Sequence, residues 1–88
     1  MHTTFYQSKV VDTIRNMVTE HFFINPEFFR LNRTFRNDFG FNSLEMTELV
    51  VMIEQQFGIQ LPDEALENVR NVSDLVRLTE QSLVRVTA

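Results

Sequence analysis

One hydroxyl group in this sequence lies where it could do chemistry. Ser43 follows Asn42 and a glycine turn at Gly40, and it precedes a helical pattern that runs to Phe57. The start of a helix has unpaired backbone N–H groups and partial positive charge, so it favours an anion such as a phosphate ester. Ser43 therefore lies at a position that favours an anion such as a phosphate ester. The alternative is that Ser43 is only part of a helix cap.

The reactive residue types that are missing narrow the chemistry further. The chain has no cysteine, which excludes disulfides, thiolate metal sites and thiol nucleophiles. Its two histidines, His2 and His21, are far apart in sequence, and we expect neither to be catalytic or to bind a metal. No nucleophile, base and orienting group are evident as a set, so we do not expect an enzyme. Any thioester would need sulfur from an attached cofactor.

The size and composition of the chain indicate a single globular domain over residues 1–88 with a modest core. Apolar residues make up 43% of the sequence, which favours a folded protein over disorder. No apolar run is long enough to span a membrane and no signal peptide is visible, so we expect a cytoplasmic protein. The small size and the polar remainder favour a monomer.

Charge is unevenly distributed along the chain. The net charge is -4, yet the segment between Arg36 and Arg70 has seven acidic residues and no Lys or Arg. An acidic surface centred on the helix that starts at Ser43 would repel nucleic acid and attract basic protein surfaces. Arg30, Arg33 and Arg36 form a basic stripe in the preceding segment. This stripe is either a solvated edge that pairs with nearby acids or a docking surface of altered polarity.

Apolar residues recur at helical spacing in four segments, which predicts an all-α chain. We expect helices over residues 4–21, 43–57, 63–69 and 73–83, with Asp63 as the cap of the third helix and a frayed tail over residues 84–88. The expected inward-facing side chains of the first, second and last helices are Tyr6, Val10, Ile14, Met17, Val18, Met46, Leu49, Val50, Ile53, Phe57, Leu75, Val76, Leu78 and Leu83. No convincing β pattern is present.

The second predicted helix has clear start and stop signals. Asn42 is a good N-cap, Glu45 three residues later completes a capping-box pattern, and Gly58 ends the helix. Beside the core stripe runs a second, partly apolar strip with acids alongside it, formed by Leu44, Thr47, Val51 and Met52. We interpret this strip as a partner-binding face. The alternative is a helix that is buried on two sides.

The segment between the first two predicted helices is long and rich in apolar residues. Residues 23–42 include Pro26 and Gly40, which break regular structure, and eight large apolar side chains. Loops of this length are uncommon unless they pack or act. We expect this loop to pack over the helices as a lid, with a short helical turn near residues 26–29.

The residues around Ser43 resemble those of acyl carrier proteins. That family typically has Asp-Leu-Gly-x-Asp-Ser-Leu-Asp at the start of a helix, then x-x-Glu-Leu-Val, and later Phe-x-x-x-Ile-Pro-Asp-Glu. This chain has Asp-Phe-Gly-Phe-Asn-Ser-Leu-Glu at residues 38–45, Thr-Glu-Leu-Val at 47–50 and Phe-Gly-Ile-Gln-Leu-Pro-Asp-Glu at 57–64. The resemblance covers nearly the whole chain, and the motifs are specific in combination.

The resemblance implies a four-helix bundle of the acyl carrier type, with a long first loop and a short third helix. It implies that a phosphopantetheinyl transferase attaches 4'-phosphopantetheine from coenzyme A to Ser43, and that acyl groups are held as thioesters on that arm. Further partners would be acyl-loading, acyl-transfer or condensing enzymes with basic docking surfaces. The expected docking residues are Leu44, Glu45, Thr47, Glu48, Val51 and Glu54. Candidates for an acyl cleft, or for ordinary core packing, are Ile59, Leu61, Ala65, Leu66 and Val69.

Departures from the family pattern indicate a specialised, discrete carrier of a fatty-acid or polyketide-type pathway. The residue before the serine is usually an aspartate that is thought to help the transferase and its metal, and here it is Asn42. Phe39 and Phe41 replace smaller residues. A peptidyl carrier fits less well, because those proteins usually approach the serine with Gly-Gly-x-Ser-Leu. Two alternatives stay open: an unmodified carrier-like adaptor or assembly subunit, and an unrelated small helical interaction domain.

Overall fold

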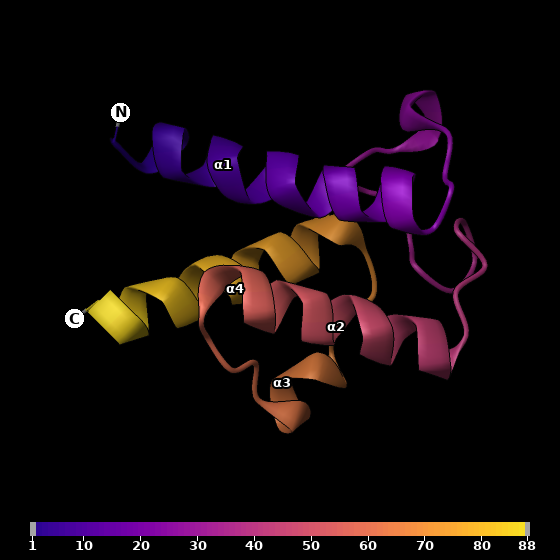
Figure 1. Cartoon of the computed structure of the whole chain (residues 1–88). Helices are drawn as coiled ribbons and strands as arrows, with labels where there is room; N and C mark the ends of the chain where they lie inside the picture. Colours follow the sequence, from indigo (N-terminus) through magenta and orange to yellow (C-terminus); the bar gives the residue numbers. More distant parts are fainter. Residues whose placement is uncertain (1, 88) are drawn as a thin grey trace.

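The computed structural model describes the backbone of residues 2–87 and the side chains of residues 9–84. Within these residues the α-helices are α1 (His2–Asn16), α2 (Ser43–Phe57), α3 (Asp63–Leu66) and α4 (Val72–Thr87). Figure 1 shows α1 along one side of the molecule and the short α3 below α2, and α4 packs against α1. The predicted all-α architecture with four helices is confirmed. None of the described helices is long and apolar enough to cross a lipid bilayer.

The first predicted helix, residues 4–21, corresponds to α1 and a π-helical turn, η1 (Met17–His21), which follows it directly. Val10, Ile14 and Val18 recur at intervals of four residues and are fully buried, as the periodicity predicts. The predicted core residue Tyr6 lies outside the described side chains. This helix therefore contributes one apolar face, which packs mainly against α4.

The boundaries of α2 follow its predicted signals. Leu49, Val50 and Ile53 are buried in the core, and Met46 and Phe57 pack partly against it. Gly58 ends the helix in the left-handed region at φ 65°, and its N–H donates to the carbonyl of Glu54. The predicted core stripe of this helix is confirmed.

The long loop packs on the helices only in part. Its short turn is the 3₁₀-helix η2 (Pro26–Phe28), and Phe29, Phe35 and Phe41 are buried as expected of a lid. The expectation that its apolar residues would be buried together is wrong for Phe23, Phe28 and Leu31, which are exposed.

Local geometry explains two of these exposed rings. Phe23 adopts φ 60° between the half-buried Phe22 and Ile24, so the chain turns inward on both sides and leaves this side chain 89% exposed. The guanidinium of Arg33 lies 4.1 Å from the centre of the Phe28 ring and covers one face of it. Apolar composition therefore overestimates the burial of this loop.

The last two helices differ from their predicted limits. α3 is a single turn rather than a helix over residues 63–69, and its N-cap position is Pro62 rather than Asp63. α4 begins at Val72, one residue early, and continues to Thr87. The predicted fraying is therefore wrong up to Thr87, because each further residue adds a backbone hydrogen bond to a helix that has already formed.

The loop is joined to the connection between α3 and α4 by backbone pairing. An isolated antiparallel β-bridge links Thr34 and Asn71, and next to it the N–H of Phe35 donates to the carbonyl of Arg70 over 3.0 Å. This pairing ties the segment that precedes Ser43 to the segment that precedes α4.

Candidate functional site

The predicted capping box at the start of α2 is confirmed. Asn42 has an extended backbone, and its Oδ1 accepts a hydrogen bond from the Glu45 N–H over 2.8 Å. In return, Glu45 Oε1 accepts one from the Asn42 N–H over 2.9 Å. Because these two residues supply the cap, Ser43 is not needed for it. Ser43 is the first residue of α2 and is exposed, as the attachment hypothesis requires.

A tight turn over residues 34–40 leads the chain into α2 and so to Ser43. The carboxylate of Asp38 accepts hydrogen bonds from the Thr34 N–H (2.7 Å) and the Thr34 hydroxyl (3.1 Å). The Thr34 N–H contributes most to lowering the pKa of Asp38, and the hydroxyl and the charge of Arg33 add to it against an opposing desolvation effect. Gly40 then adopts φ 74°, where a side chain would be strained.

Phe39, within this turn, lies at the centre of a cluster of phenylalanine rings. The ring of Phe39 has centroid distances of 5.9 Å to Phe28, 6.3 Å to Phe29 and 5.8 Å to both Phe35 and Phe41. These pairs are edge-on, tilted or stacked, and aromatic pairs at such distances are attractive in addition to the surface that they bury. The rings of Phe39 and Phe41 therefore help to hold the loop in place.

A groove of about 870 Å³ opens beside Ser43. It lies between α2, the loop, and the segment from α3 to the start of α4. Its lining residues are Thr34, Phe35, Arg36, Asn37, Phe41, Asn42, Ser43, Met46, Thr47, Val50, Val51, Glu54, Asp63, Leu66, Glu67, Val69 and Arg70. The site thus combines an exposed hydroxyl with an adjoining cavity large enough for part of a flexible arm.

Only two of the five predicted cleft residues line this groove. Leu66 and Val69 do so, whereas Ile59 and Leu61 are buried in the core and Ala65 packs partly against it. The expectation of a cleft at Ile59, Leu61 and Ala65 is therefore not met by this groove. For Ile59 and Leu61 the reason is the extended link after α2, in which alternate side chains point inward.

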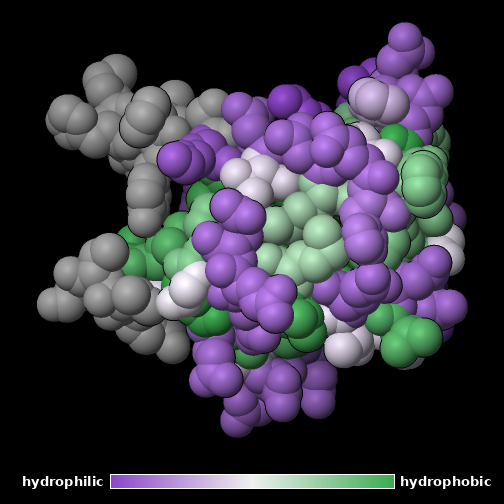
Figure 2. Space-filling view, viewed as in Figure 1, coloured by the Kyte–Doolittle hydropathy of each residue, from purple (hydrophilic) through white to green (hydrophobic). Residues whose placement is uncertain are grey.

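The exposed strip on α2 is present at three of its four predicted positions. Leu44 is 76% exposed, Val51 is 42% exposed, and Thr47 is exposed with its hydroxyl bonded to the carbonyl of Ser43. Met52 is half-buried and lines a shallow pocket together with Met17 and other residues of α1, η1 and α2. Figure 2 shows apolar surface between these two helices with hydrophilic residues around it.

The three predicted acidic docking residues differ in their exposure and in the groups that their carboxylates contact. Glu48 is exposed, and its Oε2 lies 2.6 Å from His21 Nε2. Glu45 is engaged in the capping box, and Glu54 Oε2 accepts a hydrogen bond from the Leu61 N–H over 2.9 Å. Glu48 therefore has the most accessible of the three carboxylates.

Sequence reasoning missed Arg70 as a site residue. It lines the groove because the β-bridge between Thr34 and Asn71 places its segment beside the loop. Arg36 was expected in the basic stripe of the loop, and it lines the same groove. Among the described residues, no three His, Asp or Glu side chains gather closely enough to hold a metal ion.

Comparisons with known proteins agree with this geometry. Residues 12–79 match the family model described as "Phosphopantetheine attachment site". The acyl carrier protein of Wolinella succinogenes is 38% identical over 71 residues, which cover 81% of this chain and 93% of that protein. The acyl carrier protein of Phenylobacterium zucineum is 36% identical over 76 residues, which cover 86% and 96%. This chain belongs to the acyl carrier protein family.

A solved structure supports the same fold. The crystal structure of an acyl carrier protein from Thermotoga maritima matches with a TM-score of 0.78 at 24% identity, over 91% of this chain and 93% of that chain. This match confirms the predicted fold, and the family model and the two relatives confirm the family implied by the residues around Ser43.

The cofactor of this family member is covalently attached 4'-phosphopantetheine. The residues present fit such a group, because an exposed hydroxyl at a helix start adjoins a groove. When bound, the group supplies the thiol that this chain, without cysteine, does not have.

Proposed function

We propose that 4'-phosphopantetheine is attached at Ser43 and that the chain holds acyl groups as thioesters on this arm, as a specialised carrier of a fatty-acid or polyketide-type pathway. In this role it catalyses no reaction itself. The observation that carries the proposal is the exposed Ser43 at the first position of α2, with the capping bonds supplied by Asn42 and Glu45.

Attachment needs little from this chain beyond a correctly placed hydroxyl. Ser43 Oγ would form a bond to the phosphorus that bears the pantetheine. The bond from this phosphorus to the bridging oxygen of the pyrophosphate in coenzyme A breaks, and the nucleotide half leaves with its phosphate. The partial positive charge at the start of α2 favours the phosphodiester that results. The hydroxyl proton would pass to a base of the transferase, since no hydrogen bond from Ser43 Oγ to a base is found among the described residues.

The partners proposed are the transferase and acyl-loading, acyl-transfer or condensing enzymes with basic surfaces. Leu44 and Val51 supply exposed apolar area on α2, and Glu48 supplies an accessible negative charge between them. Thr47 lies on the same side, whereas Glu45 and Glu54 add charge from fixed positions. Exposed ion pairs contribute about 0.2–1 kcal/mol each. Weak, rapidly exchanging contacts suit a carrier that visits several enzymes.

Mass spectrometry after incubation with coenzyme A and a broad-specificity transferase tests the attachment site. We expect the mass of one arm to be added to the wild-type chain and to the control Ser73→Ala, and nothing to be added to Ser43→Ala. Ser73 is a suitable control because it also lies in the first turn of a helix. A gain of mass on Ser43→Ala would place the arm elsewhere.

The second candidate function is an unmodified adaptor, and Asn42 is the observation that favours it. Asparagine keeps the capping geometry but lacks the negative charge of the usual aspartate. No mass gain with any of several transferases, together with its recovery in Asn42→Asp, would support this alternative. The expected monomer and cytoplasmic location stay predictions, and sedimentation analysis tests the first of them.

A further inference from the structure

Two arginines that are far apart in sequence belong to the lining of one groove. Arg36 and Arg70 both line the groove that contains Ser43. Phe35 joins their segments, because its N–H donates to the carbonyl of Arg70 (3.0 Å) and its own carbonyl accepts from the Phe41 N–H (2.8 Å). Phe41 is two residues before Ser43. These backbone hydrogen bonds therefore fix the segments of both arginines relative to the segment that leads to Ser43.

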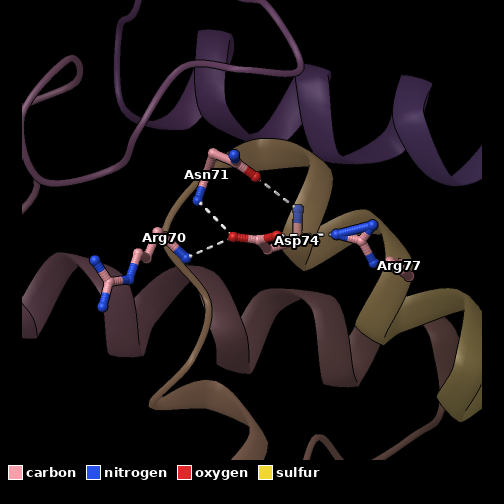
Figure 3. A network of polar contacts seen from close by, with 4 residues as sticks. All are labelled: Arg70, Asn71, Asp74 and Arg77. Carbon is pink, nitrogen blue, oxygen red and sulfur yellow. Dashed lines mark hydrogen bonds and ion pairs between the residues drawn. The ribbon is translucent and has the colours of Figure 1, made fainter.

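The guanidinium groups of these two residues are not engaged by acids. None of the ion pairs between described side chains involves Arg36 or Arg70. Figure 3 shows that the Arg70 side chain points away from Asp74, although its backbone N–H donates to that carboxylate over 3.0 Å. Asp74 instead binds the guanidinium of Arg77 over 2.9 Å. Both groove arginines can therefore bind another anion.

Three acids, Glu54, Asp63 and Glu67, also line the groove. Glu54 follows Ser43 by eleven residues on α2, which is about 16 Å at the rise of an α-helix. Its carboxylate is bonded to the link after α2. Of the other two acids, Asp63 is the first residue of α3 and Glu67 follows its last residue. The nearest acid in sequence, Glu45, directs one oxygen to the N–H of Asn42. The groove is thus lined by two arginines and three acids, and of these acids Glu54 is already bonded to a backbone N–H.

We propose that Arg36 and Arg70 bind the phosphodiester that joins the arm to Ser43. Guanidinium groups match phosphate oxygens in geometry and charge, and they keep their charge at all physiological pH values. The inference rests on the proposed function, because it requires the arm to be attached at Ser43. Bound in this way, the arm would start along the groove toward Leu66 and Val69 instead of into solvent.

NMR spectroscopy of the apo and holo chains tests the inference. The forms compared are the wild type, the double variant Arg36→Gln/Arg70→Gln and the control Arg30→Gln, whose exposed arginine lies outside the groove. Mass spectrometry first confirms one arm on each holo form. We expect arm addition to shift the Nε–Hε signals of Arg36 and Arg70 but not of Arg30, and added salt to reverse the shift. The ³¹P signal should move in the double variant and stay in place in Arg30→Gln.

Other outcomes overturn the inference in distinguishable ways. Unchanged Nε–Hε signals of Arg36 and Arg70 in the holo wild type would exclude the contact, whatever the folding of the variants. Signals that change only when the arm holds an acyl group with a terminal carboxylate would assign the arginines to the cargo and not to the phosphodiester. Absence of an arm on Ser43, seen already in the mass spectrum, is a failure of the proposed function itself.

Discussion

Helices α2 and α4 begin with the same kind of capping motif, but the residue that follows the cap is exposed in α2 and buried in α4. At α2, Asn42 and Glu45 exchange hydrogen bonds between side chain and backbone. At α4, Asn71 Oδ1 accepts from the Asp74 N–H (2.8 Å), and Asp74 Oδ2 accepts from the Asn71 N–H (3.3 Å), as Figure 3 shows. Both are reciprocal caps with an asparagine followed three residues later by an acid.

The residue that follows each asparagine separates the two starts. Ser43 is exposed beside a groove and Leu44 after it is 76% exposed, whereas Val72 is fully buried. The cap determines where a helix begins, and the next side chain determines whether that beginning serves a site or the core. A capping motif alone therefore carries no information about function.

The largest effect on stability is expected at Val72, the buried first residue of α4. Val72→Ala should lower the free energy of unfolding by about 2 kcal/mol, because it removes two buried methyl groups and leaves a cavity. Chemical denaturation measures this loss, and arm addition should be unaffected. A variant as stable as the wild type would show that the two starts do not differ in packing.

The two caps themselves should contribute similarly. Asn42→Ala and Asn71→Ala should each lower the free energy of unfolding by about 1 kcal/mol, since each leaves a backbone N–H without its partner. Asn42→Asp, which retains the cap, serves as the control for the first. Only Asn42→Ala should also slow arm addition, and a time course by mass spectrometry measures this rate. Equal rates of arm addition in the two variants would show that the cap at Asn42 does not contribute to attachment.

A smaller effect concerns the acid side of the pH profile. The hydrogen bond from Arg77 and those from the backbone N–H groups of Arg70 and Asn71 hold the pKa of Asp74 below its ordinary value of 3.8, against an opposing desolvation effect. A lowered pKa stabilises the fold above the ordinary value, and this contribution is lost as the pH falls through the folded-state pKa. Denaturation at a series of pH values below 5 should show a shallower loss for Asp74→Asn than for the wild type; parallel curves would contradict the assignment.

The smallest effect on stability is expected at the attachment site. Ser43→Ala should change the free energy of unfolding by less than about 0.5 kcal/mol, because the side chain is exposed and does not form the cap. Together with Val72→Ala, this result would show that the first residue of α4 contributes to the core, whereas the first residue of α2 does not. A loss comparable to that of Val72→Ala would make Ser43 a structural residue.

Local signals explain why the site could be predicted from sequence. The cap at Asn42, its partner Glu45, the stop at Gly58 and the turn at Pro26 each depend on residues within one helical turn. The same kind of signal exists at Asn71 and Asp74, but the helix was predicted to begin two residues after this asparagine instead of one.

The remaining features depend on contacts that no local pattern encodes. Arg70 reaches the groove through a single β-bridge, which has no strand periodicity in the sequence. The outward direction of Phe23 depends on one left-handed residue that is not glycine. In contrast, the burial of Ile59 and Leu61 on either side of the exposed Gln60 follows the period of an extended chain.

The rings around Phe39 have a consequence for recognition. A loop without regular secondary structure normally loses conformational freedom when it is bound, and this loss weakens the complex. Here four neighbouring rings already order the approach to the reactive serine. An enzyme that docks on this loop meets a preorganised surface, so its association should resemble rigid docking and not folding upon binding.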